Sequence, residues 1–553
     1  MSEQREKIVE NVVKGIIAAH PSSERQFLLF NRRLSGTFKI PPIPKGELAA
    51  VYHTLVKSQE VKASAPFHKF LRFRSVRTLS GVAPVTVLTK PYACPGKCVY
   101  CPTEPNMPKS YLSNEPAAMR AVQNSFDPYR QVHNRLTSYR HNQHVPEKIE
   151  LLVLGGTWSA YPWDYQQWFI KRCFEAANYF PYTSTGQKIP KGVRSFSLAQ
   201  AQKINERARY RIIGVTLETR PDWITDQEIV RLRRLGCTRV QLGAQILDDE
   251  VLDLIKRGHH VEHLISATRK LKENCFKIDY HLMQNLPGAT VEKDIFTVEE
   301  TFRNSDFRPD QIKIYPTIVN EYAELYDWLL DGRYQPYPQE HLVELLIRLK
   351  TIIPYYCRIN RLIRDIPSES IIAGNKVTNL REMLQREMKK RQLACRCIRC
   401  REVRGGITTV FDPQLFMEEY DASGGTEYFL SYESNDRRQL FAFTRLRVNS
   451  SKPQLLFPEL EGAALIRELH TYGVLTGLKE HNDKAVQHRG LGQQLMLAAE
   501  KIAREHGAKK MAVIAGTGAK QYYKEKLGYH DAGNYMLKSL LKRPKESYNK
   551  ENH

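Results

Sequence analysis

The stretch that decides the fold of this chain is Cys94-Pro-Gly-Lys-Cys98-Val-Tyr-Cys101, which comes shortly after an apolar run at 82–88. Three cysteines this close together predict a metal centre. Three thiolates can bind three irons of a 4Fe–4S cluster and leave the fourth iron open for a ligand. A structural zinc ion would need a fourth ligand, usually from a second Cys or Cys/His pair, and no such pair lies nearby. We therefore predict an iron–sulfur site at these three cysteines.

The spacing of the cysteines, with Tyr100 immediately before the last one, is similar to the signature of the radical S-adenosylmethionine (SAM) superfamily. The resemblance implies that SAM chelates the open iron through its amino and carboxylate groups. It also implies that an electron from the cluster cleaves SAM to a 5′-deoxyadenosyl radical. Gly155 and Gly156 follow the second predicted strand, where glycines would let the backbone approach the methionine part of SAM, although any strand-to-helix turn can use glycines.

Short β-rich runs alternate with helical patterns from about residue 78 to residue 320. The predicted strands are 84–88, 149–154, 212–218, 239–243, 277–283 and 311–315. Helical patterns between them cover 163–179, 226–235, 262–274 and 292–303. Six βα units imply a parallel sheet with right-handed crossovers, as an open sheet or a partial barrel. We predict an α/β protein with a partial (βα)6 barrel, because the cluster loop follows the first strand and ligand sites gather at the carboxyl ends of barrel strands.

A chain of 553 residues is too long for one hydrophobic core and is expected to form two or three domains. After the barrel the sequence is first helical and basic, and then β-rich around one long helix at 491–506. We predict a small helical basic N-terminal region, the barrel, a helical linker with a cysteine-rich end, a C-terminal α+β domain and a charged tail. Their ranges are 1–77, 78–320, 321–405, 406–541 and 542–553.

The chain is strongly basic, with 83 Lys and Arg against 60 Asp and Glu and a formal net charge of +23. This excess favours a polyanionic partner, with nucleic acid as the leading candidate. The first 77 residues carry 14 Lys and Arg against 6 Asp and Glu, interleaved with aromatics such as Phe27 and Phe67. These rings either stack on unpaired bases or form the core of a small helical domain. The predicted RNA-binding side chains are Arg32, Arg33, Lys39, Lys69, Arg72, Arg74 and Arg77.

Four polar residues lie on the last two predicted strands of the barrel. Alternate residues of a strand share a face, so Lys277 and His281 lie on one face and Lys313 and Tyr315 on another. If these faces point into the barrel, they present cations and a hydroxyl group where a nucleotide could bind. The alternative, in which they face the outer helices, would bury lysine at a high cost in free energy.

A second group of cysteines, Cys395, Cys397 and Cys400, lies at the end of the helical linker. Our first interpretation is a zinc ion held by three thiolates and one remote ligand, for which Cys357 and several histidines are candidates. A second iron–sulfur cluster and free thiols are the alternatives. Both cysteine groups suit metal binding in a reducing cytosol better than a disulfide framework.

The C-terminal domain holds Gln487-His488-Arg489-Gly490-Leu491-Gly492 just before its long helix. This Gln-x-x-Gly-x-Gly pattern resembles the pyrophosphate loop of the GNAT acetyltransferases, in which backbone N–H groups at a helix N-terminus bind coenzyme A. A strand and the pair Tyr522-Tyr523 follow in the order typical of that family. The resemblance implies that one of these tyrosines lies near the thioester sulfur, while the other has a packing role.

The combination of both patterns resembles the catalytic subunit of Elongator in its single-protein bacterial or archaeal form. The similar stretches include Gly258-His259, His281-Leu-Met-x-Asn285, Lys313-Ile-Tyr315-Pro-Thr317 and Arg467-Glu468-Leu-His470, and Gln284 stands where many relatives have proline. This resemblance implies a tRNA-modifying enzyme that installs a carboxymethyl group on C5 of the wobble uridine, using SAM and acetyl-CoA. In the implied scheme the deoxyadenosyl radical takes a hydrogen atom from the acetyl methyl group, the carbon radical adds to uridine C5, and the thioester is hydrolysed.

The resemblance also implies roles for single residues. Gly155 and Gly156 would contact SAM, and Lys277 and Tyr315 would engage the uridine. The residues that would bind or hydrolyse acetyl-CoA are 487–492, His470, Tyr522 and Tyr523. The basic N-terminal residues would hold the anticodon stem-loop, whose wobble base must be splayed into the barrel. The alternative function is a protein lysine acetyltransferase with a non-catalytic SAM-binding barrel.

The sequence also predicts where the protein works. No apolar run approaches the roughly 20 residues that a membrane span needs, and residues 1–10 are too charged for a signal peptide. We therefore expect a cytoplasmic protein without membrane contact. Radical chemistry further requires an electron donor, and whether the chain forms a homodimer stays open.

Overall fold

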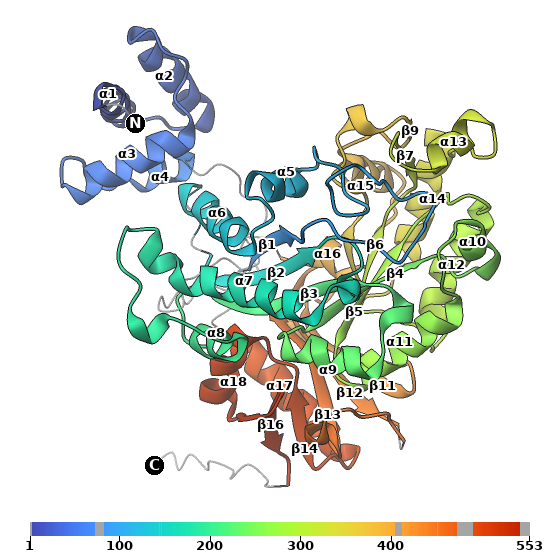
Figure 1. Ribbon diagram of the computed structural model, residues 1–553. Helices are drawn as coiled ribbons and strands as arrows, with labels where there is room; N and C mark the ends of the chain where they lie inside the picture. The colour runs from blue at the N-terminus through green and yellow to red at the C-terminus, as the bar shows by residue number, and fades with distance from the viewer. Residues whose placement is uncertain are drawn as a thin grey trace, which may run out of the picture.

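The computed structural model describes residues 3–71, 82–142, 144, 146–403, 412–450, 452–472 and 490–541. Arg72, Arg74, Arg77, Gln487, His488, Arg489 and the tail at 542–553 lie outside the described residues. The chain forms a small helical unit, a parallel sheet covered by helices and a second, mostly antiparallel sheet (Figure 1).

The N-terminal unit contains four helices around a core of its own. They are α1 (Glu3–Ala18), α2 (Glu24–Thr37), α3 (Lys45–Lys57) and α4 (Ala65–Leu71). Ser23 begins α2 by accepting a hydrogen bond from the backbone N–H of Gln26. Phe27 and Phe67 are buried and lie edge to face at 5.8 Å. For these two rings, packing in the core of the helical unit is therefore the correct alternative.

The central element is a seven-stranded sheet in the order β1-β2-β3-β4-β5-β6-β8, with every neighbouring pair parallel. The strands are β1 (Ala83–Leu88), β2 (Lys148–Leu154), β3 (Arg211–Thr219), β4 (Arg239–Gln245), β5 (Lys277–Leu282), β6 (Gln311–Ile314) and β8 (Arg358–Arg361). The first six match the predicted strands with slightly different ends. The predicted partial barrel is confirmed as a curled parallel half-barrel.

Helices between the strands cover the outer face of the sheet (Figure 1). They include α5 (Pro116–Gln123), α6 (Pro128–His141), α7 (Trp163–Thr183), α8 (Leu198–Asn205), α9 (Asp226–Arg234), α10 (Asp249–Leu254), α11 (Val261–Glu273) and α12 (Val291–Arg303). Thr225 caps α9 by accepting a hydrogen bond from the backbone N–H of Glu228 at 3.1 Å. The four predicted helical patterns correspond to α7, α9, α11 and α12.

Strand β8 is the seventh strand of the sheet and was not predicted. It comes from the linker, whose other elements are α13 (Leu325–Leu330), α14 (Gln339–Ile352), α15 (Leu380–Lys390) and α16 (Ile398–Arg401), with a two-residue pair of β7 (Ile318–Val319) and β9 (Ala373–Gly374). The sequence of β8 is Arg-Ile-Asn-Arg, and only Ile359 is buried. Its polar side chains face the interior of the half-barrel, so the strand lacks the apolar pattern by which strands are predicted.

The C-terminal sheet has the order β10-β11-β12-β13-β14-β16-β15. Its strands are β10 (Gln414–Asp421), β11 (Gly425–Glu433), β12 (Leu440–Asn449), β13 (Ala463–Thr471), β14 (Lys510–Val513), β15 (His530–Ala532) and β16 (Tyr535–Ser539). Only β13 and β14 are parallel neighbours in this sheet. The predicted long helix is α17 (Leu491–Glu505), and α18 (Lys520–Leu527) carries the tyrosine pair.

The two sheets are packed against each other as one body. One buried apolar cluster extends from Val85 in β1 to Phe443 in β12. The segment around Gly516 and Gly518 lies directly on β3, and a Cβ atom at Gly516 would be 2.0 Å from the carbonyl oxygen of Ile213. These glycines therefore permit the close approach of the C-terminal domain to the start of the barrel strand. Among the described residues, no helix is long and apolar enough to cross a membrane.

Candidate active site at the junction of the two sheets

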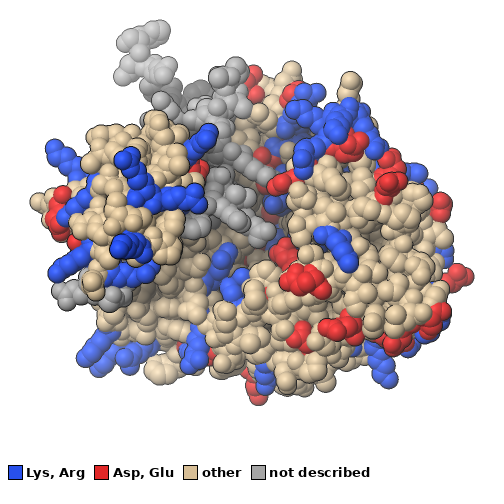
Figure 2. All heavy atoms as spheres, turned by 90° about the horizontal axis from the view of Figure 1, so that it is seen from above, with Lys and Arg blue, Asp and Glu red and all other residues tan. Residues whose placement is uncertain are grey.

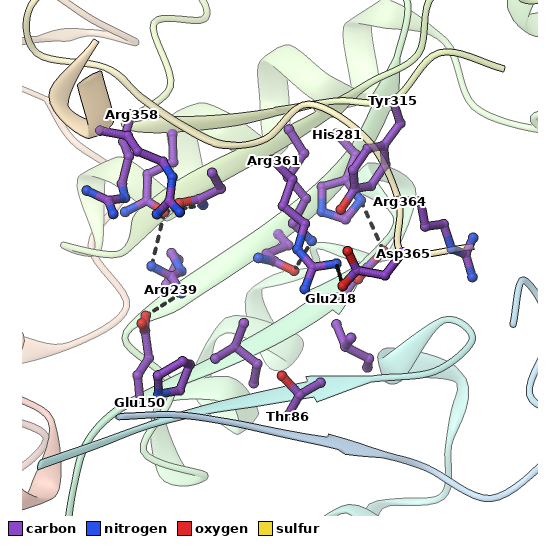
Figure 3. A pocket seen from close by; sticks show the side chains of 18 of the residues that line it. Thr86, Glu150, Glu218, Arg239, His281, Tyr315, Arg358, Arg361, Arg364 and Asp365 are labelled. Atoms are coloured by element: carbon purple, nitrogen blue, oxygen red, sulfur yellow. Dashed lines mark hydrogen bonds and ion pairs between the residues drawn. The ribbon is translucent and has the colours of Figure 1, made fainter. Parts of the chain in front are cut away.

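A cavity of about 840 Å³ opens inside the half-barrel and continues to the C-terminal sheet. Lys277, His281 and Tyr315 line it from the parallel sheet, and His470 and Tyr523 line it from the C-terminal domain. Lys313 also lines it. The prediction that the polar faces of β5 and β6 point into the barrel is therefore correct. In Figure 3, Glu218, His281 and Tyr315 lie together, while Glu150, Arg239 and Arg358 lie toward the other end of the cavity.

The barrel side of the cavity holds an acid–histidine pair. His281 Nδ1 lies 3.1 Å from Glu218 Oε1. Burial favours the neutral carboxyl, but His281 and Lys313 outweigh this effect and lower the pKa of Glu218 to about 2. Glu218 Oε2 and His281 Nε2 are buried without a hydrogen-bond partner, so both are available to a ligand in the cavity.

Lys313 is held by the neighbouring strand. Its Nζ donates a hydrogen bond to Gln241 Oε1 at 2.9 Å, and burial lowers the pKa of Lys313 to about 8. Gln241 in turn donates to Asp279 Oδ2 at 2.9 Å. The interior of the half-barrel is therefore polar and hydrogen-bonded, which suits a polar ring such as a nucleobase better than an apolar ligand.

The C-terminal domain reaches Lys277 directly. Glu468 on β13 places Oε1 3.3 Å from Lys277 Nζ and accepts a hydrogen bond from Arg445 Nε at 3.0 Å on its other oxygen. Burial opposes ionisation, but Lys277 and Arg445 outweigh it and lower the pKa of Glu468 to about 2. Burial also lowers the pKa of the nearby His470 to about 4, so this imidazole is neutral at pH 7. Its Nε2 is buried without a partner.

Glu468 lines the cavity but was not among the predicted site residues, although it lies in one of the stretches similar to the family. It lies 191 residues from Lys277 in the chain, and only the packing of the two sheets brings them together. One feature of the sequence could have indicated Glu468. It lies beside Arg467 in a strand that begins with apolar residues, and charged residues in such a strand need partners when they are buried.

The cysteine loop lies at the carboxyl end of β1, beside the glycine turn after β2. Cys94 Sγ is 3.6 Å from Thr157 Oγ1. Gly155 has a φ of +152°, and a Cβ atom there would be 2.0 Å from Thr89 Oγ1. The predicted SAM-binding turn and the predicted cluster ligands are therefore neighbours in space.

The sulfur positions distinguish the two cysteine groups. The Sγ atoms of Cys395, Cys397 and Cys400 all lie within 4.8 Å of one another, and within the described ranges no such compact group includes Cys94, Cys98 or Cys101. Thiolates on one zinc ion lie about 2.3 Å from it, so they must be close together. Wider spacing fits thiolates that bind separate irons of one cluster. The second group is therefore compact enough to bind a metal ion or a cluster, and the first group is not compact enough for a single ion.

Comparison with known proteins agrees with this geometry. Residues 89–297 match the Radical SAM superfamily, 309–390 the Radical SAM C-terminal domain, and 408–529 the Acetyltransferase (GNAT) family. The chain is 43% identical over 486 residues to the tRNA uridine(34) acetyltransferase of Methanocaldococcus jannaschii, which covers 85% of this chain and 86% of the relative. It is 36% identical to human Elongator complex protein 3, over 85% and 86% of the two chains.

The chain belongs to the Elongator complex protein 3 family. A solved structure titled as the archaeal Methanocaldococcus infernus Elp3 with an N-terminal deletion has 40% identity and a TM-score of 0.71, and covers 83% of this chain and 99% of that one. Membership in the radical SAM and GNAT families implies SAM, an iron–sulfur cluster and acetyl-CoA as the small molecules of this protein.

In this member of the Elongator complex protein 3 family, the two predicted tyrosines occupy different places. Gly490 has a φ of +72° and precedes α17, whose N-terminal N–H groups can receive an anion. A Cβ atom at Gly492 would lie 2.9 Å from the hydroxyl oxygen of Tyr522, which is 40% exposed. Tyr523 is buried and lines the cavity. Tyr522 therefore lies beside the start of α17, and Tyr523 faces the junction of the two sheets.

In the second cysteine group, Cys395 and Cys397 lie between α15 and α16, and Cys400 lies in α16. Burial opposes ionisation of Cys397, but its sulfur neighbours and Lys350 outweigh this effect and lower the pKa of Cys397 well below the usual value of a thiol. Lys350 Nζ lies 3.8 Å from Cys400 Sγ. Cys357 does not join the compact group, which among the described residues consists of these three sulfurs. The group is consistent with a metal ion or a cluster.

The predicted RNA-binding residues that the structure describes lie away from the cavity. Arg32, Arg33 and Lys39 are exposed at the end of α2 and just after it, and Lys69 lies in α4. Lys and Arg gather on the lobe at the left of Figure 2, which is the side of the N-terminal helices in Figure 1.

The paired carboxyls of the cavity predict an acid-sensitive fold. Glu218 and Glu468 have pKa values of about 2, against 4.5 for an ordinary glutamate. The unfolded chain therefore takes up protons first as the pH falls, so the free energy of unfolding should decrease between about pH 4.5 and pH 2. In denaturant titrations across this pH range, the free energy of unfolding of the double variant Glu218→Gln/Glu468→Gln should decrease less steeply with falling pH than that of the wild type. Identical slopes for the two proteins would contradict this source of stability.

Proposed function

We propose that this protein modifies the wobble uridine of tRNA by installing a carboxymethyl group at C5, with SAM and acetyl-CoA as co-substrates. The single observation that carries the proposal is the continuous cavity. It joins the barrel interior, near the predicted cluster loop, to the tyrosine and histidine of the GNAT domain. Relatives at 42–43% identity are named tRNA uridine(34) acetyltransferase, which supports a tRNA uridine as substrate.

The residues present suit the small molecules that both families imply. We propose that Cys94, Cys98 and Cys101 hold a 4Fe–4S cluster and that Gly155 and Gly156 contact SAM. With SAM bound, the cluster supplies a 5′-deoxyadenosyl radical for hydrogen abstraction. The N-terminal turn of α17 binds the diphosphate of acetyl-CoA, and Tyr522 lies beside it.

The cavity residues orient the two reactants. We propose that Lys277 and Tyr315 hydrogen-bond the uracil ring, because both line the cavity. The carboxylate of Glu468 keeps the Lys277 ammonium at the side of the GNAT domain. His470 is neutral at pH 7, and its unpartnered Nε2 can accept a proton from the water that hydrolyses the thioester.

The test is reconstitution of the reaction in vitro. Anaerobically prepared protein is incubated with tRNA, a reductant, SAM and acetyl-CoA labelled with ¹³C in the acetyl methyl group. We expect labelled 5-carboxymethyluridine after nucleoside mass spectrometry, and none when SAM or acetyl-CoA is omitted. Acetylated protein lysines without any modified uridine would instead support the alternative of a lysine acetyltransferase.

The exposed arginines of α2 give a separate prediction for tRNA binding. Replacing Arg32 and Arg33 together by glutamine removes two cations that can neutralise phosphates. The slope of log Kd against log salt concentration should decrease by about 2, because each lost phosphate contact changes the slope by about 1. Filter binding at several salt concentrations measures this slope. The control is Arg303→Gln, an exposed arginine on α12 that should leave the slope unchanged.

A further inference from the structure

The cysteine loop packs against a buried arginine, Arg257, which follows α10. Arg257 is 7% exposed. Its Nη1 donates a hydrogen bond to Cys98 Sγ at 3.5 Å, and its Nη2 donates to the carbonyl oxygen of Gly243 at 2.7 Å. The backbone N–H of Val99 also donates to the carbonyl oxygen of Ile255 at 3.2 Å, which ties the cysteine loop to this segment. One guanidinium N–H is therefore aimed at a predicted cluster sulfur.

The charge of Arg257 has no carboxylate partner within ion-pair distance among the described residues, and its Nε is buried without a hydrogen-bond partner. The neighbouring Arg220 differs, because Asp222 binds its Nε and Nη2 at 2.9 and 3.0 Å. A buried cation without a counter-charge is costly. A 4Fe–4S cluster with three thiolates is negatively charged and becomes more negative on reduction. A cluster bound at the three cysteines would therefore supply the counter-charge that Arg257 lacks.

Glycines make the room for both arginines. A Cβ atom at Gly243, inside β4, would lie 2.4 Å from Arg257 Nη2. A Cβ atom at Gly96, inside the cysteine loop, would lie 2.7 Å from Arg220 Nη1. Glycine weakens the interior of a strand, so its presence at 243 indicates that the backbone must admit a close neighbour. This neighbour is the guanidinium that binds Cys98.

We propose that Arg257 is a positioning residue that raises the reduction potential of the iron–sulfur cluster through its hydrogen bond to Cys98 Sγ and its unneutralised charge. Reduction adds an electron to a thiolate-bound centre, and a donor and a positive charge at one of its sulfurs stabilise the reduced state more than the oxidised state. The electron donor can then reduce a larger fraction of the protein. This inference rests on the proposed cluster at Cys94, Cys98 and Cys101.

The test measures the potential without tRNA or turnover. Wild-type protein, Arg257→Lys and Arg257→Met are reconstituted with iron and sulfide, and the electron paramagnetic resonance signal of the reduced cluster is followed against the solution potential. At the wild-type midpoint, the ratio of reduced to oxidised cluster should decrease at least tenfold in Arg257→Met, which is about 59 mV for one electron. The reduction potential of Arg257→Lys should lie between those of the wild type and Arg257→Met, because lysine keeps the positive charge but lacks the planar set of guanidinium N–H donors.

The matched control is Lys256→Met, which removes a neighbouring exposed cation that pairs with Glu324 at 2.5 Å. Its potential should equal that of the wild type. If Arg257→Met holds a full complement of cluster and its midpoint reduction potential equals that of the wild type, the proposal is overturned. Loss of the cluster from both Arg257 variants, with unchanged thermal unfolding, would also overturn it, because the arginine would then serve assembly alone. Wild-type protein that binds no cluster would instead refute the metal assignment within the proposed function.

Discussion

Replacing Cys98 by alanine is expected to abolish modified uridine and leave tRNA binding intact. The substitution removes one of the three thiolates that hold the proposed cluster, so iron should be lost and no radical can form. We expect product formation to decrease by roughly 10³-fold or more, the scale on which removal of an essential group acts. Nucleoside mass spectrometry measures the product, and an iron assay and filter binding measure the two other properties.

The matched control is Cys173→Ala, which removes a buried free cysteine of α7 that packs in the apolar core and does not line the cavity. It should keep the iron content and most of the activity. Normal modification of tRNA by Cys98→Ala, with its iron lost, would refute the role of the cluster in the reaction.

Replacing Asp310 by asparagine is expected to cause the largest loss of stability. Asp310 is fully buried between the sheets, accepts hydrogen bonds from Arg467 Nη1 at 2.9 Å and from the backbone N–H of Ile278 at 2.8 Å, and lies 3.6 Å from Arg445. Breaking a buried ion pair leaves uncompensated charges in the interior and typically costs 3–5 kcal/mol. We expect a decrease of about 3–5 kcal/mol in the free energy of unfolding, measured by denaturant titration.

The control for this variant is Asp306→Asn, which makes the same chemical change at an exposed position four residues earlier. It should change the unfolding free energy by less than about 0.5 kcal/mol. Equal effects of the two substitutions would contradict the importance of the buried network. Because Arg445 also binds Glu468, loss of Asp310 should in addition lower turnover if Lys277 has the proposed role in the reaction.

Much of the fold follows from local sequence signals. The first six strands of the half-barrel carry buried apolar residues in short runs, and the helices between them carry the matching helical period. Strand β8 could not be predicted in this way because polar residues, including Arg358 and Arg361, stand where an apolar pattern would be expected. The strand is instead defined by its parallel pairing with β6. In the N-terminal unit, composition left two alternatives for Phe27 and Phe67, and only packing could decide between them.

The candidate site likewise combines features that local sequence indicates and features that only tertiary packing produces. The spacing of Cys94, Cys98 and Cys101 and the loop at 487–492 indicate their chemistry from sequence alone, because in these two cases the residues of the motif lie within a few positions of one another in the chain. The partners of these groups lie far away in the chain. Lys277 meets Glu468, and Cys98 meets Arg257, because strands and loops from distant segments pack together.

The sequence by itself therefore determined the two kinds of chemistry, their order along the chain and the polar faces of the barrel strands. Tertiary structure alone decided that residues of the barrel strands and of the C-terminal sheet line one cavity, that Tyr523 lines it while Tyr522 does not, and that buried ion pairs join the two sheets. The physical reason is the distance along the chain over which each kind of interaction acts. Ligand spacing and strand periodicity are local properties, whereas a buried charge is satisfied by whichever residue the packing of the sheets brings within hydrogen-bond distance.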